Sequence, residues 1–111
     1  PELFAAVSRA YDAHLARRDE LVALLQERGA EPVASAATYT LPSNPVTEGD
    51  VRRTGRRVEE SSAARYSLLV RDAADRDART WAIEALTDAA VRALDFGSAP
   101  RAFPGAAELS R

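Results

Sequence analysis

Apolar residues recur every three or four positions over residues 2–28, which predicts a long amphipathic helix. Two neighbouring rows of positions fit this period equally well. Both rows contain His14, the only histidine, so we expect its imidazole to point toward the core on either choice. Gly29 suits the left-handed position after a last turn and Pro32 cannot continue a helix, so the element ends there. The two rows are Phe4, Val7, Tyr11, His14, Arg18, Leu21 and Leu25, and Leu3, Val7, Ala10, His14, Arg17, Leu21 and Leu24.

Residues 30–46 read AEPVASAATYTLPSNPV, with small or β-branched residues between the prolines. Proline biases the residue before it away from the helical conformation, so this stretch is expected to be extended. A connection of this length is unusual inside a compact domain. It indicates that the chain crosses the length of a helical bundle and does not turn back in a tight hairpin.

A second helix is predicted from Thr47 to about Asp72. Thr47 and Asp50 resemble a capping box, with aspartate in place of the usual glutamate or glutamine. Small residues on the inward side, such as Gly55, let a neighbouring helix approach closely. The expected inward row is Val51, Gly55, Val58, Ser62, Arg65 or Tyr66, and Leu69.

A third helix is predicted over residues 76–96, with Asp75 as its N-cap. Gly97 and Pro100 end it. Its expected inner stripe is Ile83, Leu86, Ala90, Ala93 and Leu94, with Trp81 near one end.

The composition limits the classes of protein to consider. A chain of 111 residues is sufficient for one domain, which we place at residues 1–105, followed by a tail at residues 106–111. Only 6% of the residues are aromatic, so the core is expected to consist of closely packed, alanine-rich helices. The lack of cysteine excludes disulfides and thiolate metal sites, and it agrees with a cytoplasmic location.

Neither a membrane nor a nucleic acid is expected as a partner. No apolar run approaches the roughly 20 residues of a membrane-spanning helix. The net charge is -2. The arginine run RRTGRR at residues 52–57 is preceded and followed by acidic residues, so the charges over residues 48–60 cancel. Such pairs stabilise a solvated helix, and no aromatic residue is interleaved for base stacking.

Several motifs together resemble an uncharacterised actinobacterial family described as a ferritin-like domain of unknown function. They are HLARRDELVALLQERGAEP, then ATYTLP, then a helix containing Val58 and Glu59, and finally FPG. The resemblance implies an all-α, ferritin-like up-down bundle with three long helices in this chain and a long crossover between the first two. A fourth helix would come from upstream or from a partner subunit. The resemblance implies a fold and no particular activity.

The residues argue against the di-iron oxidase chemistry of some ferritin-like proteins. That centre uses Glu-x-x-His pairs on two helices. Tyr11 stands three residues before His14, and the third helix has no histidine. A single iron, manganese or zinc ion bound by His14, Glu59 and Glu84, with Asp88 as a further candidate, remains an alternative.

We favour a structural role for His14, in an interior polar network with Glu59 and Tyr66. The same network would neutralise Arg17 or Arg18, and the helical period does not decide which of the two faces inward. Burial without such partners would be costly. A small molecule bound around His14 and Tyr66 is a further alternative.

The chain is therefore expected to be a non-enzymatic helical domain without a cofactor, although the sequence leaves enzymatic activity open. Phe4, Leu21 and Leu25 form an apolar stripe that three helices would cover poorly. Such an uncovered stripe is typical of an interface. We expect a homodimer or a higher homo-oligomer, or the binding of another partner.

Overall fold

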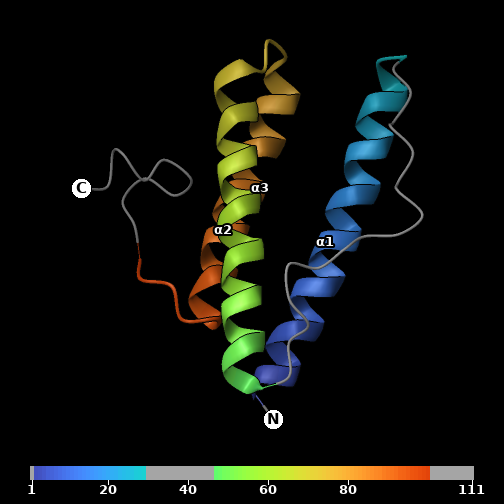
Figure 1. Cartoon of the computed structure of the whole chain (residues 1–111). Coiled ribbons are helices and arrows are strands. Elements are labelled where there is room, and N and C mark those ends of the chain that lie inside the picture. Colours follow the sequence, from blue (N-terminus) through green and yellow to red (C-terminus); the bar gives the residue numbers. More distant parts are fainter. Residues whose placement is uncertain (1, 30–46, 101–111) are drawn as a thin grey trace.

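The described residues form an all-α bundle of three helices, as the sequence predicts (Figure 1). The computed structural model describes residues 2–29 and 47–100, and these residues contain no strand. The helices are α1 (Glu2–Glu27), α2 (Glu48–Asp72) and α3 (Arg76–Asp95). The predicted connection at residues 30–46 and the tail at residues 106–111 lie outside the described residues.

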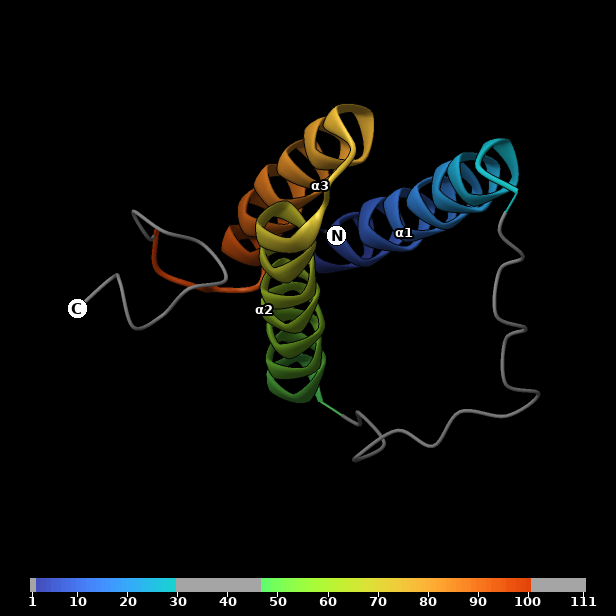
Figure 2. The same ribbon diagram turned by 90° about the horizontal axis from the view of Figure 1, so that it is seen from above.

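Helices α1 and α2 run in the same direction, and α3 runs antiparallel to both (Figure 1). α2 and α3 form a close hairpin, whereas α1 diverges from them toward its C-terminal end (Figures 1 and 2). The end of α1 and the start of α2 therefore lie at opposite ends of the bundle. The positions of these two described ends agree with the crossover that the sequence indicates. None of the three described helices is long and apolar enough to cross a membrane.

The helix ends follow the predicted signals. The Asp50 N–H donates to Thr47 Oγ1 at 3.1 Å and the Thr47 N–H donates to the Asp50 carboxylate at 3.3 Å, which completes the capping box of α2. Asp75 caps α3 by accepting from the backbone N–H of Asp77 at 2.8 Å. Gly29 and Gly97 have φ of 72° and 95° after α1 and α3, a conformation that suits glycine.

The predicted inner stripe of α3 is wrong at Ile83 and Leu94, whereas Ala93 and Trp81 are buried as predicted. Ile83 and Leu94 are 47% and 43% exposed, whereas Ala82, Ala85 and Ala89 are completely buried. α2 and α3 pack so closely that the contact face of α3 is built mainly from methyl groups, and the larger aliphatic residues lie outside. The buried row is Trp81, Ala82, Ala85, Ala89, Ala93 and Phe96.

Two clusters of buried residues hold the bundle together. At one end Phe96 packs against Ala6 and Ala10 of α1. At the other end Trp81 packs with Leu21 of α1 and Tyr66 of α2. Each cluster includes residues of the hairpin and of α1, so α1 is fixed at both ends although it diverges from α2.

Ion pairs supplement this packing along α1. Arg17 pairs with Asp88 of α3, and Arg28 pairs with Asp75 in the turn before α3. A longer contact of 3.6 Å joins Arg9 to Asp95. Charged side chains thus contact the hairpin from α1 in addition to its apolar face.

Candidate functional site

Glu59 is the only charged residue among the described ones that is fully buried, and it links all three helices. Its Oε1 lies 2.7 Å from His14 Nε2 on α1, and its Oε2 accepts from Arg92 Nε on α3 at 3.1 Å. Both carboxylate oxygens are thus used by partners on other helices. This pairing offsets the cost of removing the charge from water.

The contact with Glu59 determines the tautomer of neutral His14. A carboxylate only accepts hydrogen bonds, so Nε2 of His14 carries the proton and Nδ1 has a free lone pair. No described residue hydrogen-bonds to Nδ1. The imidazole is partly exposed and borders the groove described below.

Arg92 is the functional-site residue that the sequence did not predict. Its side chain is 11% exposed, and its Nη2 is buried without a hydrogen-bond partner among the described residues. Arg92 follows Ala89 by three residues and precedes Phe96 by four, which places it beside the buried alanines of α3. A charged residue on a helix face of alanines was the sequence signal that could have identified Arg92 as buried.

Of the two arginines that the helical period did not separate, Arg17 faces the interior. Its side chain is 14% exposed, whereas that of Arg18 is 62% exposed and contacts only Asp19 among the described residues. Arg18 is therefore not part of the interior network. The arginine that pairs with Glu59 is Arg92 of α3.

Arg17 is the centre of a second polar group, at the α1–α3 contact. It donates to Asp88 and, at 2.9 Å, to Glu20, and its guanidinium lies 5.8 Å from the centre of the Trp81 ring. Trp81 Nε1 also donates to Glu20, at 2.8 Å. Partial desolvation opposes the change, but Asp88 and Glu20 raise the pKa of Arg17 above its ordinary value.

Tyr66 lies beside both polar groups. Its ring meets Trp81 edge-on, with centroids 5.6 Å apart and an interplanar angle of 87°. Desolvation raises the pKa of Tyr66, although Arg92 and Arg17 act in the opposite direction. Within the described part of the chain no hydrogen bond joins Tyr66 to His14 or Glu59.

Glu84, the third candidate metal ligand, is not brought to the other two. It is exposed on α3 between the buried residues Ala82 and Ala85. Over residues 2–29 and 47–100 no group of three or more histidine, cysteine, aspartate or glutamate residues is placed to hold a metal ion. His14 and Glu59 meet as an acid–base pair, and Asp88 binds Arg17.

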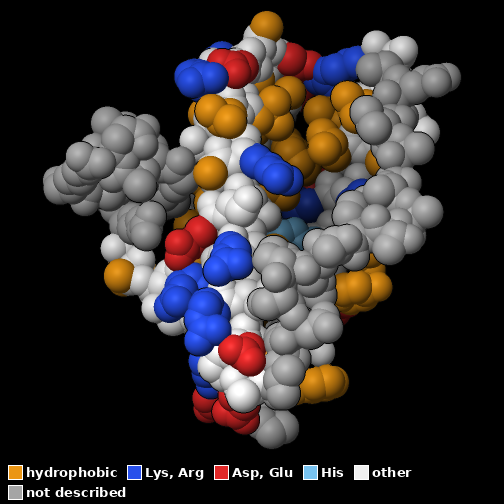
Figure 3. Space-filling view, in the orientation of Figure 1, with side chains coloured by type: hydrophobic (Ala, Val, Ile, Leu, Met, Phe, Trp, Pro, Cys, Tyr) orange, Lys and Arg blue, Asp and Glu red, His pale blue; other side chains and the backbone are white. Residues whose placement is uncertain are grey.

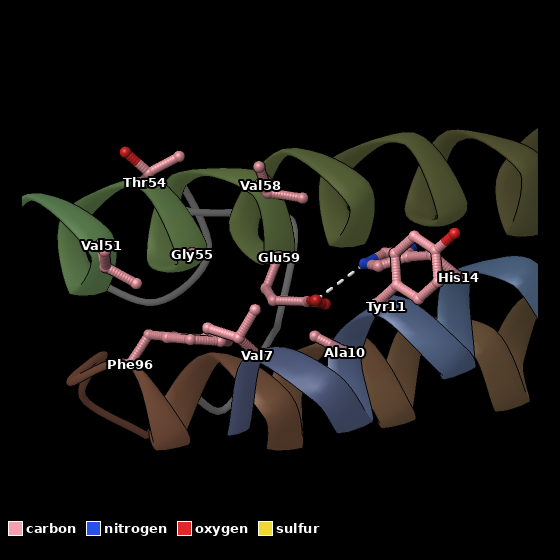
Figure 4. A pocket seen from close by; sticks show the side chains of 10 residues that line it. All are labelled: Val7, Ala10, Tyr11, His14, Val51, Thr54, Gly55, Val58, Glu59 and Phe96. Atoms are coloured by element: carbon pink, nitrogen blue, oxygen red, sulfur yellow. Dashed lines mark hydrogen bonds and ion pairs between the residues drawn. The ribbon is translucent and has the colours of Figure 1, made fainter. Parts of the chain in front are cut away.

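A groove of about 290 Å³ lies between α1 and α2 and extends from the His14–Glu59 pair toward Val51 and Phe96 (Figure 4). Val7 and Tyr11 line it on α1, Val58 lines it on α2, and Phe96 contributes to its floor. In the upper part of Figure 3, hydrophobic side chains surround a separate hollow between α1 and α2, and the histidine is visible at its lower end. The surface of the groove is thus almost entirely apolar, and the buried Glu59 carboxylate beside it is already paired.

The rows that carry these groove residues continue along both helices. Residues at three- and four-residue spacing share one face of a helix. The rows are Phe4, Val7, Tyr11, Leu15, Arg18, Val22 and Leu25 on α1, and Val51, Thr54, Val58, Ser62, Arg65 and Leu69 on α2.

Comparisons with known proteins agree with an uncharacterised helical domain. The chain is similar to the crystal structure of a conserved hypothetical protein, rv2844, from Mycobacterium tuberculosis, with a TM-score of 0.80 and 32% sequence identity. The similarity covers 86% of this chain and 73% of that one. No curated protein matches the chain. A family model described as a domain of unknown function (DUF4439) matches residues 1–108, and the chain therefore belongs to this family.

Proposed function

We propose that this protein is a non-enzymatic helical domain that acts by association, with a helix of a second copy or of another protein bound in the groove between α1 and α2. The exposure of the groove walls carries the proposal. Tyr11 and Val7 on one wall are 65% and 41% exposed, and Val58 on the opposite wall is 45% exposed. Large apolar residues exposed side by side in this way are typical of interaction surfaces.

The arrangement of the helices supports a helical occupant. α3 runs antiparallel to α1 and α2 and packs against both, so the groove lies at the corner of the bundle diagonal to α3. A helix antiparallel to α1 and α2 would complete a four-helix bundle there. The same arrangement supports the proposal of a ferritin-like fold.

The interior polar groups favour a structural role over catalysis. Glu59 is saturated by His14 and Arg92, and no described serine or threonine hydroxyl bonds to His14. A base without a nucleophile or an ordered acid beside it does not form the arrangement used in nucleophilic catalysis. The lack of cysteine in the chain supports a cytoplasmic location for the domain.

Two aspartate substitutions of equally exposed residues test the association. Val58→Asp puts a charge on the groove wall, and Ile83→Asp puts one on the outer side of α3, where Ile83 is 47% exposed. Sedimentation velocity over a concentration series, and anisotropy with a labelled amphipathic helical peptide, measure self-association and helix binding. We expect Val58→Asp to weaken whichever association occurs at least tenfold, and Ile83→Asp to leave it unchanged. Equal effects of the two variants, or no association in either assay, would overturn the proposal.

Elemental analysis tests the metal alternative separately. Protein produced with iron, manganese or zinc supplied should contain none of them in stoichiometric amount, because the described residues bring only His14 and Glu59 together. Near-stoichiometric metal that disappears in His14→Ala would replace this proposal with a metal site.

A further inference from the structure

The arginine run of α2 is less neutral in the structure than in the sequence. Over residues 48–60 the acidic and basic residues are equal in number. Glu59, however, is fully buried in its contacts with α1 and α3, so its charge is compensated inside the bundle. Asp50 pairs with Arg53 at 3.0 Å. The outer side of α2 therefore carries more positive than negative charge.

Three of these arginines meet at one hollow on the surface of α2. The hollow has a volume of about 540 Å³, and the described residues that line it are Arg53, Arg56, Arg57, Glu60 and Ser61. Spacings of three and four residues place these side chains on one face of the helix. In Figure 3 basic side chains gather over the lower half of α2, which contains these arginines. The hollow thus brings three guanidinium groups and one hydroxyl together.

Arg56 differs from the other shielded arginines because it has no carboxylate partner. Among the described arginines only Arg17, Arg56 and Arg92 are partly buried. Arg17 and Arg92 bind carboxylates across helix–helix contacts, whereas Arg56 makes no hydrogen bond or ion pair with any described residue. Removing a guanidinium from part of its water without a counter-charge is costly. Arg56 is therefore suited to an anion from outside the described bundle.

The end of α3 closes one side of this region. A Cβ atom built on Gly97 would lie 3.7 Å from Arg56 Nη1, so the guanidinium is beside the backbone that follows α3. Ser98 Oγ donates to Glu60 at 2.8 Å, which ties the same segment to α2. The partial burial of Arg56 thus follows from the contact between two elements. Arg57 is exposed and, like Arg56, has no described partner.

The lining favours a small anion over a protein or a nucleic acid. None of the described residues around the hollow is apolar or aromatic. Protein interfaces depend on buried aromatic or apolar anchors, and single-stranded nucleic acids stack their bases on aromatic rings. Arginine, by contrast, binds phosphate through paired and charge-assisted hydrogen bonds. A phosphate group also has enough oxygens to accept from two guanidinium groups and a hydroxyl at once.

We propose that this hollow is a second binding site, in which Arg56 and Arg57 bind the phosphate group of a small phosphorylated molecule or inorganic phosphate. Ser61 donates a further hydrogen bond, and the charge of Glu60 limits the affinity. The hollow and the groove between α1 and α2 share no lining residue. Phosphate binding is therefore a property separate from the association of helices in the groove.

NMR titrations of the nitrogen-15-labelled protein test the proposal. The added probes are inorganic phosphate, glycerol phosphate and, as the uncharged control, glycerol. We expect both phosphates to shift the signals of residues 53–61 at low salt, and sodium chloride to weaken their binding because the contact is ionic. Glycerol should shift none of these signals. Tighter binding of glycerol phosphate assigns the site to phosphorylated molecules, and binding no tighter than that of inorganic phosphate assigns it to the free ion.

Two double variants assign the binding to this hollow. Arg56→Gln/Arg57→Gln should weaken phosphate binding at least tenfold. Arg65→Gln/Arg76→Gln removes the same charge from two exposed arginines outside the hollow, neither of which has a described partner, and should leave binding nearly unchanged. Arg57→Gln alone should also weaken binding. Because Arg57 is exposed, this single variant keeps the test valid if the loss of Arg56 affects folding.

A variant of Glu60 supplies a test in the opposite direction. Glu60→Gln removes a negative charge from the lining and keeps an acceptor for Ser98 Oγ. It should therefore tighten phosphate binding severalfold. A decrease in affinity would show that the charges of this lining do not control binding, which contradicts the proposal.

The remaining outcomes overturn the site or its ligand. Equal losses of affinity in the two double variants would mean that phosphate responds only to the net charge of the protein. Tighter binding of a single-stranded oligonucleotide or an acidic peptide than of either phosphate would replace the small ligand. If neither phosphate binds at low salt, Arg56 only complements the negative end of the α3 dipole, and the proposal fails. None of these outcomes bears on helix binding, which Val58→Asp tests in the groove.

Discussion

The ring of Phe96 occupies the space that a side chain at residue 55 would need. A Cβ atom built on Gly55 would lie 2.5 Å from Cδ1 of Phe96, closer than real contacts allow. The ring is also enclosed by Ala6 and Ala10 of α1 and is 2% exposed, so it has little freedom to move away. This contact sets the approach of all three helices at one end of the bundle.

Gly55→Ala should therefore destabilise the protein, although alanine is the better helix former. The gain in helix propensity is about 1 kcal/mol. Overpacking of an enclosed site costs about 1–3 kcal/mol, and here the clash involves a rigid ring. We expect a net loss in the free energy of unfolding, measured by urea denaturation, and a larger loss for Gly55→Val.

Gly49→Ala is the matched control for that prediction. Gly49 is also helical, but the nearest atom to its added Cβ is Thr47 Oγ1 at 3.7 Å, an ordinary contact. This variant should be as stable as the wild type or slightly more stable. A loss of stability equal to that of Gly55→Ala would contradict the importance of the Phe96 contact.

Glu59→Gln should be among the most destabilising conservative changes in the chain. It keeps the shape of the side chain but leaves the buried Arg92 without a counter-charge. Breaking a buried ion pair in this way costs about 3–5 kcal/mol, whereas replacing both members by apolar residues is often tolerated. Urea denaturation of Glu59→Leu, Arg92→Leu and the double variant should show that the double variant loses much less than the sum of the single losses.

His14→Gln provides the comparison for the double-mutant cycle of Glu59 and Arg92. The imidazole is partly exposed, so its loss should cost less than the loss of the Glu59 charge. If His14→Gln and Glu59→Gln both melt at the temperature of the wild type, the interior network is not a source of stability.

The helix ends could be predicted from the sequence because their signals are local. Thr47 and Asp50 satisfy each other's backbone groups, and Gly97 adopts a positive φ, with no help from distant residues. The separation of the end of α1 from the start of α2 was also predictable, because the proline-containing sequence after Gly29 does not favour a tight hairpin. These features require only the chemistry of neighbouring residues.

The phase of α3 and the role of Arg92 depend on how closely helices approach, which a single sequence does not state. Leu94 was expected inside because it is large and apolar, but α2 and α3 leave room mainly for methyl groups at their contact. Arg92 was not predicted as part of the site, because the partner that buries it, Glu59, lies on another helix. The choice of Arg17 over Arg18 likewise follows from Asp88 and Glu20, whose positions only the fold reveals.

Asp75 should make the free energy of unfolding depend on pH in the acidic range. It caps α3 and pairs with Arg28. Desolvation acts in the opposite direction, but the Asp77 N–H and Arg28 lower the pKa of Asp75 below 3.8. A carboxyl with a lowered folded-state pKa contributes stability above its unfolded pKa and loses it as the pH falls through the folded value.

Asp75→Asn isolates this contribution, because asparagine also caps helices but does not pair with Arg28. We expect the wild type to melt at a higher temperature than the variant at neutral pH, and the difference to shrink below about pH 4. A difference that stays constant from pH 7 down to pH 2 would show that the charge of Asp75 contributes nothing.

Trp81 should report directly on whether α1 is attached to the hairpin. It is the only tryptophan in the chain, and its indole N–H donates to Glu20 of α1 beside Arg17. Glu20→Ala removes this acceptor, so the Trp81 emission should shift to longer wavelength as water reaches the indole, with a loss of about 1 kcal/mol in the free energy of unfolding. Asp19→Ala changes an exposed neighbour that contacts only Arg18 among the described residues, and its spectrum should match that of the wild type. Equal shifts in the two variants would mean that the Trp81 emission senses the charge of α1 in general and not the contact with Glu20. A shift confined to Glu20→Ala makes the emission a probe of the position of α1 when a helix binds in the groove.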